Sequence, residues 1–318
     1  MHKYAPKTIG GYFGLELPMG NVWHTGAVSL NSGRNALQYL LRARSPVKIY
    51  IPQFTCAAIA ETIAGLGIEF EHYGIDEAME PIFDYAKVAE NEAFLYTNYF
   101  GLKNQYIQGL IDRGCHLIID NAQSFFSPRI EAFDTFYSPR KFFGVPDGGY
   151  AFGGHPIELE QDHSSERTEH LMIRHDDSAR AGYVTFQANE GLLATIPMKA
   201  MSALSDRILR SIDYVGVSLR RKINFQKLHS VLGSSNNLPI DNDRESVALT
   251  YPYLSKNSKL KSRLHAQNIF TASYWPDVEQ SVNYSSLERL YSTQIVHLPI
   301  DQRYDEVDMQ CILEVVLS

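Results

Sequence analysis

The sequence predicts an α/β protein: a large domain built on a mostly parallel sheet, followed by a smaller C-terminal α+β domain. Short apolar runs alternate with helical segments from about residue 30 to residue 155, and the alternation stops in the second half of the chain. This alternation is typical of βαβ units. The 318 residues fit two domains of about 150 residues each. We place the domains at residues 1–205 and 206–318, the second beginning with a linking helix.

The first domain accounts for most of the predicted strands. KIYIP (48–52) predicts a buried strand, and the segment 55–67 that follows has apolar residues at helical spacing before a terminal glycine. Similar patterns predict strands over 68–75, 93–101, 116–120, 132–138 and 148–154, and a helix over 105–114. Ligands bind such sheets beyond the carboxyl ends of the strands, so the residues that follow each strand are the candidate site.

The rest of the chain follows a different pattern. Residues 155–182 are polar and predict an exposed crossing or a mobile flap, and residues 197–232 predict one long helical region. The tail, about 245–318, predicts short strands and a helix.

Composition excludes several classes of protein. The 29 Lys and Arg against 36 Asp and Glu give a net charge of −7, which does not favour nucleic acid or an anionic membrane as partner. No stretch of about 18 apolar residues predicts a membrane span. Three scattered cysteines and the absence of an apolar leader at the N-terminus predict a reducing, cytoplasmic setting. The eleven histidines show no HExxH spacing, so no metal site is predicted.

The first candidate element is Ser32-Gly33-Arg34, where a loop becomes a helix. Unpaired backbone N–H groups and the helix dipole make such a start an anion site, and Gly33 allows close approach. An ordinary N-cap by Asn31 or Ser32 explains the same residues.

Two further candidates are Asp120, which ends the predicted strand 116–120, and Lys141, which follows the predicted strand 132–138. A carboxylate at the end of a buried strand is costly without a strong partner; a protonated ring nitrogen would be one, and capping of the next helix is the alternative. Desolvation by aromatic neighbours and the like charge of Arg140 are expected to favour the neutral, nucleophilic form of Lys141. The glycines at 148 and 149 would let the chain bend around a bound group.

Together these elements resemble the fold type I pyridoxal-phosphate enzymes, and more narrowly the sugar aminotransferases of the DegT/DnrJ/EryC1/StrS family. The matching stretches are SGRNAL (32–37), DNAQ (120–123), Lys141 ahead of Gly148-Gly149, and the ending HLPIDQRYDEVDM. They follow the family's order and span nearly the whole chain.

The resemblance implies pyridoxal 5'-phosphate as cofactor and a role for each matching residue. Lys141 would bond covalently to the cofactor aldehyde, Asp120 would pair with the pyridine nitrogen, and Gln123 would orient the ring or its hydroxyl. The cofactor phosphate would be held by Ser32, Gly33, Arg34 and Ser138.

Three departures from the family pattern concern the surroundings of the cofactor. Thr55-Cys56 stands where many members carry a stacking aromatic, so Phe54 or Tyr99 is expected to stack on the ring. Phe136 replaces the usual phosphate-binding serine, and Ser138 is its substitute. The family's loop toward the neighbouring subunit is reduced to Gly182–Phe186, in which Tyr183 is a candidate substrate contact.

Other candidates each have two interpretations. Asn98 and Tyr99, at the end of strand 93–101, contact substrate or pack at the strand end. Trp275 and Tyr251 line a sugar pocket or belong to the core. The basic cluster of Arg220, Arg221, Lys222 and Asn224 is a solvated helix face or contacts a nucleotide diphosphate.

The resemblance implies transfer of an amino group from an amino acid, glutamate in this family, to a nucleotide-linked keto-sugar in surface polysaccharide or related sugar synthesis. It also implies a homodimer with shared active sites. The alternative is a non-catalytic cofactor-binding or regulatory protein of the same fold, favoured by Cys56 and by the altered loop near Val184. A sugar dehydratase of this scaffold would carry histidine in place of Lys141. A nicotinamide enzyme would need a Gly-x-Gly-x-x-Gly after the first strand, which is absent.

Overall fold

The computed structural model describes residues 9–155, 157–240, 243, 245–280 and 286–318 and confirms the predicted fold class. The main sheet has eight strands in the order β1-β8-β7-β6-β5-β2-β3-β4. Strands β3, β2, β5, β6 and β7 run parallel, while β4, β8 and β1 pair antiparallel at the two edges. The strands are β1 (Val28–Leu30), β2 (Lys48–Pro52), β3 (Glu69–Ile75), β4 (Pro81–Ile82), β5 (Glu92–Thr97), β6 (Leu117–Asn121), β7 (Asp134–Tyr137) and β8 (Gly149–Phe152).

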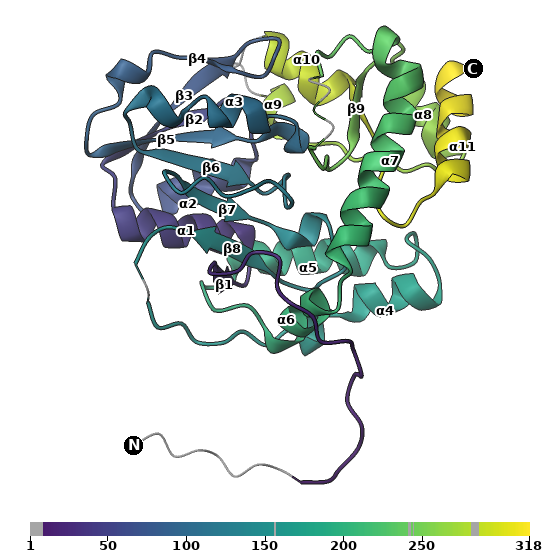
Figure 1. The fold of residues 1–318 in the computed structure, drawn as a ribbon, viewed down its shortest axis with the longest axis horizontal. Helices are drawn as coiled ribbons and strands as arrows, with labels where there is room; N and C mark the ends of the chain where they lie inside the picture. The colour runs from purple at the N-terminus through teal and green to yellow at the C-terminus, as the bar shows by residue number, and fades with distance from the viewer. Residues whose placement is uncertain (1–8, 156, 241–242, 244, 281–285) are drawn as a thin grey trace.

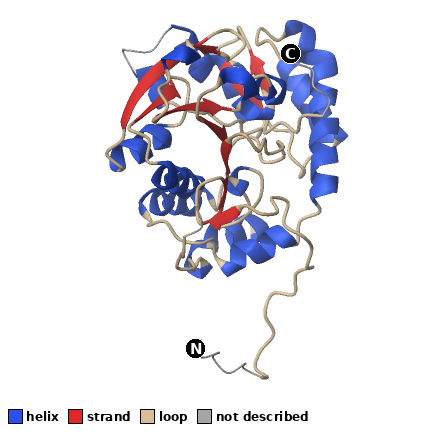
Figure 2. Ribbon diagram, turned by 60° about the vertical axis from the view of Figure 1, so that its left-hand side comes forward, coloured by secondary structure: helices blue, strands red, loops and turns tan. Residues whose placement is uncertain are grey.

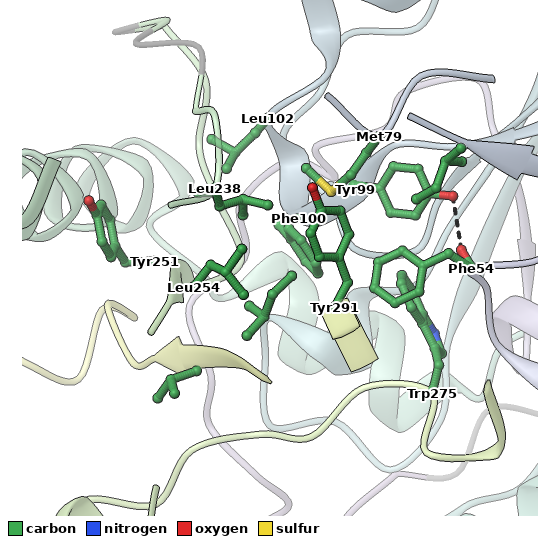
Figure 3. Packing of buried hydrophobic residues seen from close by; sticks show 14 of the residues in the cluster. Phe54, Met79, Tyr99, Phe100, Leu102, Leu238, Tyr251, Leu254, Trp275 and Tyr291 are labelled. Carbon is green, nitrogen blue, oxygen red and sulfur yellow. Dashed lines mark hydrogen bonds between the residues drawn. The ribbon is translucent and has the colours of Figure 1, made fainter. Parts of the chain in front are cut away.

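The sheet is covered on both faces, which explains the continuous apolar runs of its central strands. Ile49 and Ile51 of β2 pack toward α1 (Gly33–Arg44) and α2 (Ala57–Gly65), whereas Tyr50 between them joins the cluster on the opposite face. That second cluster contains side chains from α3 (Asn104–Gln108), from the long helix α7 (Tyr214–Leu232) and from the C-terminal elements. Figure 3 shows its aromatic centre.

The described residues 157–182 of the polar segment form a crossing that carries α4 (Glu169–Asp176) and leads into α5 (Tyr183–Thr195). The predicted single helical region over 197–232 is wrong in one respect, because α6 (Ala203–Arg210) and α7 are separate helices. The cause is Asp213, whose side chain accepts a hydrogen bond from the Gly216 N–H and so begins a new helix.

The C-terminal part has a two-stranded antiparallel sheet of β9 (Tyr251–Leu254) and β10 (Ile295–Leu298). Its helices α8 (Leu260–Ala266) and α11 (Glu306–Leu317), with α7, form the right-hand side of Figure 1, and Figure 2 shows that the helices lie outside the strands. The helices of this part are α8 (Leu260–Ala266), α9 (Asp277–Gln280), α10 (Ser286–Gln294) and α11 (Glu306–Leu317). Single 3-10 turns are η1 (Tyr85–Lys87), η2 (Tyr99–Gly101), η3 (Ile111–Arg113), η4 (Pro139–Lys141), η5 (Ser165–Arg167) and η6 (Gly233–Ser235). The boundary near residue 205 stays a proposal.

Among the helices in the described part of the chain, none combines the length and the apolar character needed to cross a bilayer.

Candidate functional site

The carboxyl edge of the sheet brings several predicted site residues onto neighbouring strands. β6 ends with Asp120 and Asn121, and the adjacent β7 ends at Tyr137, directly before Ser138. Phe136 of β7 lies opposite Asp120 in the parallel register. Phe136 is buried in the core beneath α1, so its side chain takes part in packing.

The start of α1 lies against Ser138. Ser32 is the N-cap, with φ −158° and a hydroxyl that accepts a hydrogen bond from the Asn35 N–H, so the N-cap interpretation is confirmed. A Cβ added to Gly33 would lie 3.2 Å from Cβ and 3.5 Å from Oγ of Ser138. The glycine therefore lets a hydroxyl approach the N–H groups of the first helical turn, an arrangement suited to a phosphate.

Gly148 and Gly149 pack against this same helix start. The Gly148 N–H donates to the Asn31 carbonyl at 2.9 Å, and a Cβ on Gly149 would lie 2.2 Å from the Ser32 carbonyl oxygen. The sequence predicted that these glycines let the chain bend around a bound group. In the structure they let β8 pack against the backbone of Asn31 and Ser32 at the helix start.

The Arg34 side chain points away from this cradle. Its Nη1 donates to Glu61 Oε2 of α2 at 2.8 Å, and both side chains are solvent-accessible. Only the backbone N–H of Arg34 is thus placed to meet an anion at the helix start.

Asp120 is 5% exposed and poorly satisfied. Within the described residues its carboxylate accepts one hydrogen bond, from the Ala122 N–H to Oδ1 at 2.8 Å. Burial raises the pKa of Asp120, and the charge of Lys141 and the Ala122 N–H offset this only in part. Lys141 ends the turn that follows β7, the strand next to β6, so the two predicted catalytic groups follow neighbouring strands.

Lys141 ends the turn η4, and its side chain is exposed. The expected desolvation by aromatic neighbours is therefore wrong for the single chain, because Phe142 and Phe143 turn into the core while the lysine faces outward. The neighbouring Arg140 forms an ion pair with Glu190 of α5.

Gln123 is held in one orientation. It is 2% exposed, and its Oε1 accepts a hydrogen bond from the Phe100 N–H at 3.3 Å. Phe100 has a left-handed backbone, with φ 56°. The Nε2 group of Gln123 is buried and has no hydrogen-bond partner in the described structure. An amide whose nitrogen is buried and unpaired can serve a bound group as a donor.

Asn98 and Tyr99 are fully buried, which favours the strand-end packing interpretation for both. Asn98 Nδ2 contacts the oxygens of four polar side chains, and Tyr99 donates its hydroxyl to the Phe54 carbonyl at 2.9 Å (Figure 3). Phe54 and Tyr99 stack on each other, with Trp275 at the edge of both rings. Neither ring therefore offers a free face for stacking on a cofactor.

Tyr251 is also fully buried, so it and Trp275 belong to the core rather than to a sugar pocket. Tyr183 is 55% exposed at the start of α5, where its hydroxyl accepts a hydrogen bond from Gln187. Nothing in these contacts joins Tyr183 to Asp120.

The expected basic helix face is wrong for two of its four members. Arg221 is 1% and Asn224 0% exposed, and both lie on the buried face of α7 with Phe225, Leu228 and Leu232. Their helical spacing with these apolar residues was the available signal. Arg221 Nη1 donates to the Ala248 and Leu249 carbonyls, and no nucleotide contact is needed to explain its place.

No group of three or more His, Cys, Asp and Glu side chains placed to hold a metal occurs among the residues that the structure describes.

No family model and no curated protein matches this sequence. Solved structures do match its fold. A DegT DnrJ EryC1 StrS aminotransferase from Brucella abortus has 18% identity and a TM-score of 0.60, covering 93% of this chain and 86% of that one. The sugar aminotransferase CalS13 from Micromonospora echinospora has 16% identity and a TM-score of 0.60, covering 91% and 86%. NtdA from Bacillus subtilis, solved with bound cofactor PMP, has 14% identity and a TM-score of 0.62, covering 92% and 73%. This chain is thus similar in fold to sugar aminotransferases, and the predicted resemblance is confirmed at the level of fold.

Proposed function

We propose that this chain is a pyridoxal-phosphate-dependent aminotransferase of the DegT/DnrJ/EryC1/StrS type. It would transfer an amino group from an amino acid, glutamate by resemblance, to a nucleotide-linked keto-sugar in polysaccharide or related sugar synthesis. The observation that carries the proposal is a buried Asp120 with a single hydrogen bond at the end of β6, together with Lys141 in the turn that follows the adjacent strand β7. The fold shared with proteins described as aminotransferases supports it.

The residues present fit the cofactor. The narrow space between Gly33 and Ser138 would be closed by a Cβ, and the unpaired Gln123 Nε2 is a donor that awaits an acceptor. The pKa of Asp120 is raised, and no described residue places a cation in direct contact with it; a protonated pyridine nitrogen would supply one.

Each side chain then has a defined task. The first-turn N–H groups of Gly33 and Arg34, with the Ser138 hydroxyl, bind the phosphate. Asp120 holds a proton on the ring nitrogen, and Gln123 Nε2 donates to the ring hydroxyl oxygen. When bound, the cofactor supplies an electron-accepting ring that stabilises negative charge on the substrate carbon. Lys141 Nζ would hold the cofactor through its aldehyde, and the same amine is the group that would accept and return the substrate proton.

We also propose a homodimer in which a second copy covers the exposed Lys141. Residues 9–16 support it, because this segment extends away from the body of the molecule, beyond the contacts of Leu17 and Met19 with Arg207 (Figures 1 and 2). Ile9, Tyr12 and Phe13 on it are 91%, 99% and 91% exposed. Aromatic side chains bury roughly 150–250 Å² each, so one arm could supply a large part of the roughly 800 Å² per partner of a stable interface. Light scattering should give twice the chain mass, and a Tyr12→Ser/Phe13→Ser variant should dissociate more readily; a monomeric parent would contradict the dimer.

The decisive experiment for function is to load the purified chain with pyridoxal phosphate, reduce it with borohydride and map the modified peptide. We expect covalent label on Lys141 and a visible absorption band that bleaches on addition of glutamate. Lys141→Ala should remove the label and lower turnover roughly a thousandfold or more. Its stability should change by less than about 0.5 kcal/mol, because the side chain is exposed.

Lys87→Ala is the matched control, since Lys87 is an exposed lysine in the turn η1. Label on another lysine, or parental turnover in Lys141→Ala, would refute the assignment. A band that no amino donor bleaches would favour the non-catalytic, cofactor-binding alternative. If glutamate does bleach the band, titration with nucleotide keto-sugars would identify the acceptor.

A further inference from the structure

Arg221 is a buried cation for which the proposed function has no use. It is 1% exposed, and the described structure places no carboxylate within ion-pair distance of it. Burial lowers the pKa of Arg221 to about 10, although the charge of Asp301 opposes this. A buried charge without an ion pair is costly, and an apolar side chain of similar size is often at least as stabilising. Stability alone therefore does not account for an arginine at this position.

One side of the guanidinium holds the residue that follows Lys141. Arg221 Cζ lies 4.5 Å from the centre of the Phe142 ring, over its face. Arg221 Nε donates to Gln302 Oε1 at 3.0 Å, and Gln302 Nε2 donates to the Phe142 carbonyl at 2.9 Å. Arg221 thus holds the Phe142 ring directly, and it holds the Phe142 carbonyl through Gln302.

The other side of the guanidinium leads to Gln123. Arg221 Nη1 donates to the Ala248 and Leu249 carbonyls at 3.2 and 3.1 Å. The Leu249 N–H donates to the Phe100 carbonyl at 2.9 Å, and the Phe100 N–H holds Gln123 Oε1. This second series of contacts ends on the amide whose nitrogen is left unpaired.

We propose that Arg221 is a positioning residue that joins the turn carrying Lys141 to the loop that orients Gln123, so that both side chains meet one cofactor. The inference rests on the proposed function for what the two side chains bind, but the coupling itself is a property of the chain. Arg221 comes from α7, outside the main sheet, so it also connects the C-terminal elements to the site.

The geometry requires a guanidinium. Its planar face covers a ring while its edges donate in two directions, to Gln302 and to the segment 248–249. A lysine ammonium has no planar face and one donating centre, so it cannot make both sets of contacts.

The test compares Arg221→Met with Arg220→Met, its exposed neighbour on the same helix. Amide hydrogen exchange of the cofactor-free proteins is measured first. In Arg221→Met we expect faster exchange at both Phe142 and Phe100, by about fivefold or more, and parental exchange in Arg220→Met. The Phe142 N–H bonds to the Pro139 carbonyl and the Phe100 N–H to Gln123, so these amides report the two ends of the connection directly.

Pyridoxal phosphate is then added, and its dissociation constant and the pH dependence of the visible band are measured. Arg221→Met should bind about fivefold or more weakly, with a shifted spectral titration. It should also melt lower than Arg220→Met, because the Ala248 and Leu249 carbonyls lose their donor. Parental exchange at both amides, or a lowered melting temperature with an unchanged spectral titration, would overturn the proposal and leave a purely structural arginine.

Gln302→Leu tests the contacts toward Phe142 separately from those toward Phe100. It also replaces Arg221→Met as the test if that variant does not fold. It removes the bond to the Phe142 carbonyl but leaves the donation to residues 248–249, so exchange should rise at Phe142 and stay parental at Phe100. Equal changes at both amides, or none, would contradict the connection. If the parent chain takes up no pyridoxal phosphate while the exchange pattern holds, the proposed function fails and the coupling stands.

Discussion

Two buried aspartates lie on neighbouring strands and have opposite surroundings. Asp134 begins β7 and Asp120 lies near the end of β6, and they are 3% and 5% exposed. Asp134 accepts two hydrogen bonds from Arg44, at 2.7 and 3.0 Å, and contacts His116 Nε2 at 2.9 Å. Asp120 accepts one, from a backbone N–H.

Their pKa values shift in opposite directions for this reason. Burial acts to raise both, but at Asp134 the hydrogen bonds from His116 and Arg44 outweigh it and hold the pKa below its ordinary value. At Asp120 burial prevails. Low solvent exposure alone thus does not distinguish a site from a structural contact, whereas an unfilled set of partners does.

The largest effect is expected from Asp120→Asn. The amide keeps the bond to Ala122 but cannot hold a proton on a ring nitrogen, so we expect cofactor retention to weaken and turnover to fall roughly a thousandfold. Cofactor titration and single-turnover absorbance measure the two effects. Asp134→Asn should retain cofactor and turnover when it is assayed below its melting temperature. If Asp120→Asn kept the parental activity, Asp120 would have no role in turnover, and its contrast with Asp134 would not be functional.

The next largest effect is expected from Gly153→Ala, which should lower the free energy of unfolding. Gly153 has φ 110°, and a Cβ there would lie 1.9 Å from Asp134 Oδ1. The methyl group would displace the carboxylate from Arg44, so we expect a loss of about 3 kcal/mol in the free energy of unfolding. Urea denaturation measures this. Gly191→Ala in α5, where a Cβ meets nothing within 4 Å, should be neutral or stabilising. A loss below about 1 kcal/mol for Gly153→Ala would mean that the pocket around Asp134 adapts.

A smaller loss is expected from Asp134→Asn, about 2 kcal/mol, because the half-exposed Arg44 regains water when its partner is neutralised. The folded-state pKa of Asp134 is lowered, so its contribution is present above the unfolded-state pKa and is lost as pH falls through the folded-state pKa. Variant and parent should thus converge in denaturation experiments at acid pH. A gap that persists at the lowest pH would assign the loss to packing instead.

The sequence predicted the parts of the site that depend on local pattern. Ser32-Gly33 sits at a helix start whose cap and N–H groups are set by adjacent residues, and Asp120 ends a run of apolar strand residues. The order of strands and helices also allowed the sheet to be predicted, since parallel strands must end at a common edge. The break at residues 211–213 was missed because the apolar spacing continues across it, although Asp213 is a capping residue.

What could not be predicted depends on contacts between distant segments. Arg221 lies in a basic run that looks solvated, and its partners Gln302 and Ala248 are 81 and 27 residues away. Tyr99 follows a strand toward the candidate site, yet its ring turns into the core to meet Phe54, 45 residues earlier. The outward direction of Lys141 likewise depends on how Phe142 packs against α7.

The smallest expected effect is the change in stability that Asp120→Asn causes in the cofactor-free protein. Because burial raises the folded-state pKa of Asp120, the cofactor-free chain binds a proton at Asp120 more tightly when folded than when unfolded. Its ionised carboxylate therefore destabilises the fold, fully so above the folded-state pKa, and this cost disappears as pH falls below the unfolded-state value. Cofactor-free Asp120→Asn should be more stable than the parent at neutral pH, by roughly 1 kcal/mol, and equal to it in acid. Asp134→Asn should show the opposite sign over the same pH series. If both variants were destabilised alike at neutral pH, Asp120 would be a satisfied structural carboxylate like Asp134, and the proposed pairing with a ring nitrogen would lose its support.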